Sequence, residues 1–134
     1  DHCLLVAYYS FLWMRKLHIR CSEDELIRGA LLHDYYLYDW HEKEKWHRMH
    51  GFRHPGFALS NAQRDFELSE KEKEIIRKHM WPLTAPLPYY KESYMVSLAD
   101  KICAALEMAH LYGLLGVRRN LRACRPALLR RAVQ

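Results

Sequence analysis

Residues 29–40 read GALLHDYYLYDW, and the polar pair inside this stretch decides how the chain is interpreted. An apolar helical run, residues 30–32, is followed directly by His33 and Asp34 and then by aromatic residues. Burying an imidazole or a carboxylate costs free energy unless a partner is present. The pair is therefore a hydrogen-bonded core pair, the polar end of a helix, or part of a metal site with further ligands elsewhere.

The segments around this pair carry helical signatures. Residues 2–17 are apolar nearly all round, which is typical of a buried helix. Ser22 with Glu25 three residues later forms a capping-box pattern, which opens a helix that runs to about residue 32 or 36. Residues 39–53 mix polar and aromatic side chains, and Gly51 is expected to break any helix there.

The second half of the chain continues the helical pattern. Pro55 suits the first turn of a helix through FALSNAQRDF. Ser69 and Glu72 form a second capping box, opening a helix over EKEKEIIRKHM that Pro82 closes. The proline-rich stretch PLTAPLPYY is expected to be a loop, and the stretch YKESYMVSLADKICAALEMAHLYG predicts one long helix ending at Gly113.

Length and composition favour one helical domain. The chain has 134 residues, half of them hydrophobic, which is enough for a real core. No strand-like alternation and no internal repeat is present, so we expect an all-α, single-domain helical bundle over residues 1–134.

The same totals bear on the location of the protein. No apolar run approaches the roughly 18 residues of a membrane span, and the first helix lacks the flanks of a signal peptide. The four cysteines lie far apart without a CxxC pair, as expected of free thiols in a reducing compartment. We therefore expect a cytoplasmic protein without membrane contact, and the first residue, Asp1, is consistent with a processed or trimmed N-terminus.

The net charge of +5 is concentrated near the C-terminal end. The segment RRNLRACRPALLRR, residues 118–131, holds six arginines and no acid, so the rest of the chain carries −1. A nearly neutral body disfavours binding of nucleic acid by the whole domain. Leu121, Leu128 and Leu129 interleave with the arginines, which favours an amphipathic helix on the edge of the core. The alternative is contact with nucleic acid or an acidic partner.

Nine histidines are too many for all of them to be ligands. Four stand in surroundings typical of surface or packing histidines: His18, His41, His47 and His110. His50 is less clear, because it lies one helical turn before His54. The other ligand-type residues occur near the ends or on the apolar faces of successive helices: His2, His33 with Asp34, His54, His79 and Asp100. A helical bundle can collect such residues at one interior point.

The order His, His-Asp, His, His, Asp on successive helices resembles the HD-domain superfamily of metal-dependent phosphohydrolases. The matching stretches are the helix opened by His2, ALLHD at 30–34, HPGFAL at 54–59, IIRKH at 75–79 and SLADK at 97–101. The resemblance implies a first metal held by His2, His33, Asp34 and Asp100. It also implies that Asp34 bridges to a second metal held by His54 and His79, as in the two-metal subset of the superfamily.

The resemblance implies hydrolysis of a phosphoester through a metal-activated water, with His33 and Asp34 at the catalytic centre. We expect a small phosphorylated metabolite or nucleotide as substrate, and no oligomeric state is indicated. Imidazoles with carboxylates suit Fe, Mn, Co, Ni or Zn better than Mg, so one or two such divalent ions are the expected cofactors. Arg53, Lys78 and Lys101 are candidate phosphate contacts.

The competing hypothesis is an HD domain that keeps its metal as a structural staple and serves as a ligand-binding or regulatory module. Three departures from the patterns of known relatives narrow the enzyme hypothesis. Leu37 stands where many relatives have the lysine of an HDxxK pattern. One group of two-metal relatives, the GYP-type cyclic-dinucleotide phosphodiesterases, has a GYP motif and a doubled histidine. Both are missing from this sequence, which disfavours that activity. Met80 follows His79, where dinucleoside tetraphosphate hydrolases commonly have a threonine. The sequence is therefore compatible with that activity but does not favour it.

Overall fold

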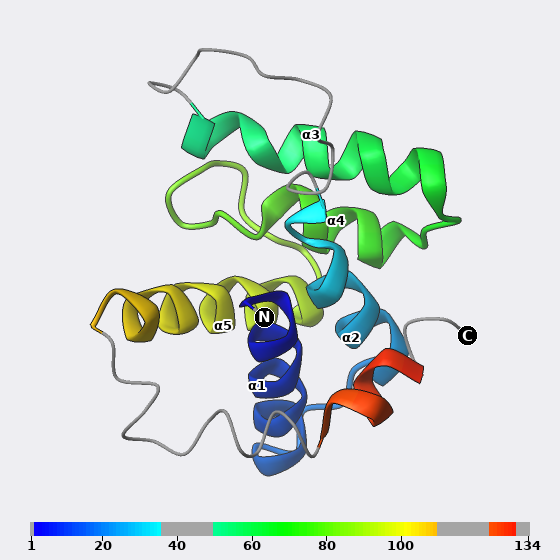
Figure 1. Ribbon diagram of the computed structural model, residues 1–134, viewed down its shortest axis with the longest axis vertical. Coiled ribbons are helices and arrows are strands. Elements are labelled where there is room, and N and C mark those ends of the chain that lie inside the picture. Colours follow the sequence, from blue (N-terminus) through cyan, green and yellow to red (C-terminus); the bar gives the residue numbers. More distant parts are fainter. Residues whose placement is uncertain (1, 36–49, 110–123, 131–134) are drawn as a thin grey trace.

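The computed structural model describes residues 2–35, 50–109 and 124–130, with the backbone alone for residues 50–53. Every regular element in these ranges is a helix, which confirms the all-α fold class. The elements are α1 (His2–Lys16), α2 (Glu23–Leu32), α3 (His50–Asp65), α4 (Glu70–Lys78) and α5 (Lys91–Met108). In Figure 1, α3 and α4 lie together above α1 and α2, and α5 crosses beside the start of α1.

Two apolar clusters hold the helices together. The larger one joins α1, α2, α4 and α5 through buried side chains that include Leu5, Val6, Leu26, Ala30, Ile75, Val96, Ala99 and Cys103. The smaller one joins α2, α3 and α4 through Leu32, Ala58, Ala62 and Ile76. Adjacent residues of α4, Ile75 and Ile76, thus belong to different clusters, and α4 links the two parts of the bundle.

Helices α2 and α4 approach closely at Gly29. A Cβ atom at this position would lie 2.6 Å from Cδ1 of Ile75 and 3.0 Å from its Cβ and Cγ2. These distances are too short for ordinary van der Waals contact, so the missing side chain permits the approach. The C-terminal ends of the two helices are consequently neighbours, and the rings of His33 and His79 that follow them are 4.9 Å apart between centroids.

The two predicted capping boxes had different outcomes. In α4 the box is confirmed, because Ser69 Oγ accepts from the backbone N–H of Glu72 and the Glu72 side chain accepts from that of Ser69. In α2 the prediction was wrong in detail. Ser22 is the N-cap residue, but its side chain makes no capping bond. Its backbone N–H donates to Glu92 of α5, 3.0 Å away. The carboxylate of Glu92 thus takes the place that the predicted capping box gave to Glu25.

Two predicted boundaries also need correction. Helix α3 begins at His50, so Gly51 does not break it and Pro55 lies inside the helix. Helix α5 ends at Met108, with Ala109 as its C-cap residue, and the rest of the predicted helix lies outside the described residues. Pro55 is the sixth residue of α3, beyond the first four residues whose N–H groups lack a helical partner, so it removes one helical hydrogen bond.

The proline-rich stretch after α4 is irregular, as predicted, and it is fastened to α4 by polar contacts. The Glu74 carboxylate accepts from the backbone N–H groups of Tyr89 and Tyr90. The Lys78 ammonium donates to Glu74 Oε1 and to the carbonyl of Leu87, at 3.0 Å each. These bonds fix the approach of the chain to α5.

Of the arginine-rich segment the structure describes residues 124–130, which are helical. Leu128 is buried and Leu129 is exposed, in keeping with the predicted amphipathic helix, while Leu121 lies outside the described residues. All four cysteines are free. Among the helices of the described ranges, none is both long and apolar enough to cross a membrane.

Candidate metal centre

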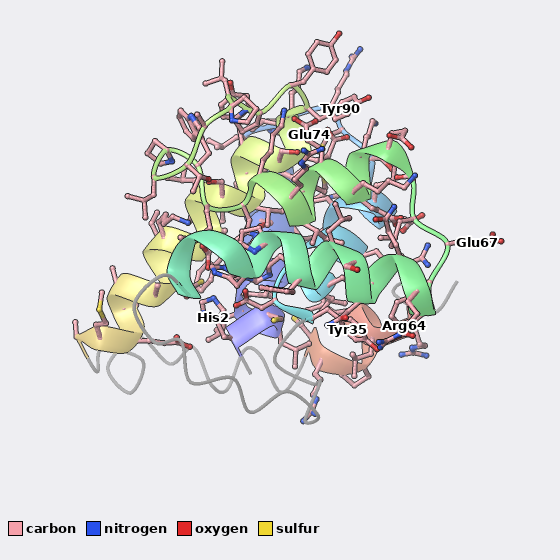
Figure 2. The ribbon with its side chains drawn as sticks, turned by 90° about the horizontal axis from the view of Figure 1, so that it is seen from above. His2, Tyr35, Arg64, Glu67, Glu74 and Tyr90 are labelled. Atoms are coloured by element: carbon pink, nitrogen blue, oxygen red, sulfur yellow. The ribbon has the colours of Figure 1, made fainter. Side chains whose placement is uncertain are left out.

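Five helices bring polar side chains to one point, which we call the histidine centre: His2, His33, Asp34, His54, His79 and Asp100. Three groups of ligand atoms there each lie within 4.8 Å of one another: His2 with His33 and Asp100, Asp34 with His54 and His79, and Cys3 with His33 and Asp34. Figure 2 shows His2 at the start of α1, close to α5, from which Asp100 comes.

His33 and His79 are held by the same local device. Each is the C-cap residue of its helix, α2 or α4. His33 Nδ1 donates to the carbonyl of Ala30 at 2.7 Å, and His79 Nδ1 donates to the carbonyl of Ile76 at 2.8 Å. Because a carbonyl can only accept, the proton sits on Nδ1 in both rings. In the neutral ring Nε2 is then a lone-pair donor for a cation.

The Nε2 atom of His33 is an unsatisfied buried acceptor. The residue is fully buried, and this nitrogen has no hydrogen-bond partner among the residues that the structure describes. The nearest carboxylate oxygens are Asp34 Oδ2 at 3.5 Å and Asp100 Oδ1 at 3.6 Å, and ionised carboxylates cannot donate. A buried polar atom without a partner is costly. A divalent cation between the imidazole and the carboxylates would satisfy all of them, so these residues fit a metal ion.

The second group has the same excess of acceptors. His54 Nε2 and His79 Nε2 are 2.8 Å apart, and Asp34 Oδ1 lies 3.6 Å from the first and 3.8 Å from the second. Burial, with the nearby His33 ring, lowers the pKa of His79 to about 3, so this ring is neutral. His54 must therefore donate the shared proton. A cation that bound both nitrogens and Asp34 would take the place of that proton.

The first group is organised by two further carboxylate contacts. His2 Nε2 donates to Asp100 Oδ1 at 2.9 Å, and His2 Nδ1 donates to Glu107 Oε2 at 3.1 Å. The bond to Asp100 is the largest cause of a raised pKa of His2. Burial raises the pKa of Asp100, but the bonds from His2 and Lys101 and the nearby ring of His33 together hold that pKa well below its usual range. Asp100 is therefore a buried, ionised carboxylate.

Two residues at this centre were missed by reasoning from the sequence. Glu107 orients His2 through Nδ1, as carboxylates that accept from the other ring nitrogen often do for metal-binding histidines. It lies seven residues after Asp100, two turns along the same face of α5, and that spacing is the signal that could have found it.

Cys3 is the other missed residue, and no sequence pattern marked it. Burial, with a contribution from Asp34, raises the pKa of its thiol to about 12. A thiol with such a pKa stays protonated at neutral pH unless a cation binds it.

The predicted site residues differ in where the structure places them. All six predicted metal ligands belong to the histidine centre. The ammonium of Lys101 lies at its edge, 2.7 Å from Asp100 Oδ2 and 2.9 Å from the carbonyl of His79. The ammonium of Lys78 is held by Glu74 and Leu87. His18 belongs to none of the three groups. The predictions for these residues fall outside the described residues or side chains: His41, His47, His50, Arg53 and His110. The metal-binding, catalytic and phosphate-binding roles stay predictions.

Comparison with known proteins gives one match. The family model of the HD domain matches residues 1–105, a range that contains every member of the histidine centre together with Cys3. No curated protein and no solved structure matches the chain. Since the match ends at residue 105, the extension of the same domain to residue 134 stays a prediction.

Proposed function

Because this chain belongs to the HD-domain family, we propose that it is a metal-dependent hydrolase that cleaves a phosphoester of a small metabolite or nucleotide. The observation that carries the proposal is the buried Nε2 atom of His33, which faces two carboxylates and has no hydrogen-bond partner in the described part of the chain. A protein built only for stability would supply a hydrogen-bond donor there.

The orientation of Asp34 supports a pair of ions. Its Oδ2 lies toward His33, at 3.5 Å, and its Oδ1 lies toward His54, at 3.6 Å. One carboxylate thus faces both groups of ligands, as a bridging carboxylate must. We assign His2, His33, Asp34 and Asp100 to one ion and Asp34, His54 and His79 to the other. When bound, such ions neutralise phosphoryl oxygens and make water nucleophilic near neutral pH.

The side chains around the ions then have distinct tasks. Glu107 holds the His2 ring in place, and the backbone carbonyls of Ala30 and Ile76 hold the rings of His33 and His79. Lys101 is the best supported of the predicted phosphate contacts, because its ammonium lies at the edge of the centre and its side chain is partly exposed. The nitrogen-rich ligand set favours Fe, Mn, Co, Ni or Zn over Mg.

The alternative is a regulatory module in which the metal is a structural staple. It is favoured by one observation: the ligands come from all five labelled helices, so two bound ions together would tie these helices to one another. A staple contributes its binding free energy to folding. The two functions therefore predict different results when a ligand is removed.

The test begins with metal analysis of protein purified without chelators, followed by a phosphoester panel with added Mn²⁺. His79→Ala should lose one ion and most of the hydrolysis rate while the fold persists. His18→Asn is the matched control, because His18 lies outside the centre and asparagine tolerates its φ of 51°. A wild type that binds metal but hydrolyses nothing, with His79→Ala unfolded, would establish the staple in place of the enzyme.

A further inference from the structure

A thiol lies at the edge of the histidine centre, in a place that the two proposed ion sites do not use. We propose that Cys3 is an additional soft ligand of the metal centre, and that it biases the centre toward Zn²⁺ and Co²⁺ over Mn²⁺ and Mg²⁺. The inference rests on the proposed function, because it concerns the selectivity of the same metal centre.

The first support is geometric. Cys3 Sγ, a ring nitrogen of His33 and a carboxylate oxygen of Asp34 lie within 4.8 Å of one another. Two donors of one tetrahedral zinc ion, at about 2.0–2.3 Å from it, lie about 3.3–3.8 Å apart. Side-chain movements of about 1 Å would let one ion contact all three residues. Cys3 follows His2 in the first turn of α1, and each of the two residues belongs to a ligand group that includes His33.

The second support is the unsatisfied nitrogen of His33, which belongs to the same group. The ring is fully buried, and its Nε2 receives no hydrogen bond, from the Cys3 thiol or from any other group in the described part of the chain. The lone pair of His33 Nε2, the Cys3 thiol and the Asp34 carboxylate therefore lie close together, and neither of the other two groups donates a hydrogen bond to this nitrogen. A cation is the partner that all three can share.

The other cysteines lie in different surroundings. Cys103 is fully buried among apolar side chains, as free cysteines commonly are. Cys21 lies in the connection between α1 and α2. It is partly buried and belongs to none of the three ligand groups. Only Cys3, among the four, lies beside both an imidazole and a carboxylate of the centre. Thiolate sulfur favours Zn²⁺ and Co²⁺ and contributes little to binding Mn²⁺ or Mg²⁺.

The experiment uses Co²⁺ as a spectroscopic probe of the full chain. A sulfur ligand gives a near-ultraviolet sulfur-to-cobalt charge-transfer band, which we expect in the wild type. Cys3→Ser should bind Co²⁺ without this band, whereas Cys21→Ser should keep it. In competition titrations, Cys3→Ser should lower the ratio of Zn²⁺ to Mn²⁺ affinity by about tenfold or more, and Cys21→Ser should leave it unchanged.

The outcomes separate this inference from the proposed function. If the wild type binds Co²⁺ without the band, or if the band survives in Cys3→Ser, the thiol is not a ligand, and the hydrolase proposal stands. If the wild type binds no divalent ion, both fall. If Cys3→Ser does not fold, the second measurement is the rate of thiol alkylation in the wild type, with and without Zn²⁺. Bound Zn²⁺ should then slow alkylation of Cys3 and leave that of Cys21 unchanged, and equal rates at Cys3 with and without Zn²⁺ would overturn the inference.

Discussion

Two buried polar clusters in this bundle look alike in composition but differ in their hydrogen bonding. The glutamate cluster consists of Glu25, Lys71 and Glu92 with the backbone N–H of Ser22. Glu92 is only 3% exposed, and its Oε1 accepts from Ser22 N and from Lys71 Nζ at 3.0 Å each. Lys71 also pairs with Glu25 at 3.1 Å. Every charge in this cluster has a partner from the chain itself.

The histidine centre is the opposite case. It contains lone pairs and carboxylates in excess of donors, and His33 Nε2 has no partner among the described residues. In Figure 2, Tyr90, the N-cap residue of α5, lies on the opposite side of the molecule from His2. Burial and charge alone therefore do not distinguish a structural cluster from a functional one. The balance of donors and acceptors does.

The largest expected effect comes from a substitution that disrupts the histidine centre and leaves the fold intact. Asp34→Asn should reduce phosphoester hydrolysis by about three orders of magnitude or more, because it removes the charge that faces both ligand groups. In chelator its melting temperature should not fall, since an asparagine amide can donate to His33 Nε2 where the carboxylate could not. Kinetics and thermal melts measure both. A fully active Asp34→Asn protein contradicts the assignment.

The next largest effect is expected from a substitution that disrupts the glutamate cluster. Glu92→Ala leaves a backbone donor and Lys71 without their buried acceptor, and should lower the free energy of unfolding by about 2–3 kcal/mol. The rate per folded molecule should not change. Urea unfolding measures the first and steady-state kinetics the second.

The control for this experiment is Glu70→Ala. Glu70 also pairs with a lysine, Lys73 at 2.7 Å, but its side chain is 79% exposed. Removing it should cost less than about 0.5 kcal/mol. Equal effects of Glu70→Ala and Glu92→Ala would show that the buried bonds of the glutamate cluster contribute nothing special.

The smallest expected effect is an acid dependence of the glutamate cluster. Burial raises the pKa of Glu92, but the bonds from Ser22 and Lys71 together hold it below the ordinary value of 4.5. The stability that this carboxylate contributes is therefore present above about pH 4.5 and is lost as the pH falls through the lower pKa of the folded state. Unfolding free energies of wild type and Glu92→Gln should converge as the pH falls below 4.5. A constant difference across that range would contradict the shift.

Much of this arrangement could be predicted from the sequence, because helix ends leave local marks. The capping box at Ser69, the apolar run before His33 and the proline-rich loop before α5 each depend on neighbouring residues. The six candidate ligands could be found because they recur on successive helices, with His33 and Asp34 as an adjacent pair. They converge in space because the helices pack where Gly29 and Ile75 allow it.

The rest depends on distant partners, which local patterns do not contain. Glu92 takes the capping role expected of Glu25, although it lies 70 residues from Ser22. Glu107 and Cys3 are recognisable only once α1, α2 and α5 are placed together. Pro55 suggested a helix start by its ordinary preference, but α3 begins five residues earlier, at His50.

The C-cap histidines of α2 and α4 have a consequence for the motions of the protein. The bond from each Nδ1 occupies a carbonyl that a helix end otherwise leaves free, so one contact both closes the helix and aims the ring. Fraying of either helix end must then turn its ring away from the centre, and a ring held by a ligand keeps its helix end closed. Helix-end opening and ligand release are therefore one event, and amide hydrogen exchange near His33 and His79 would report on both.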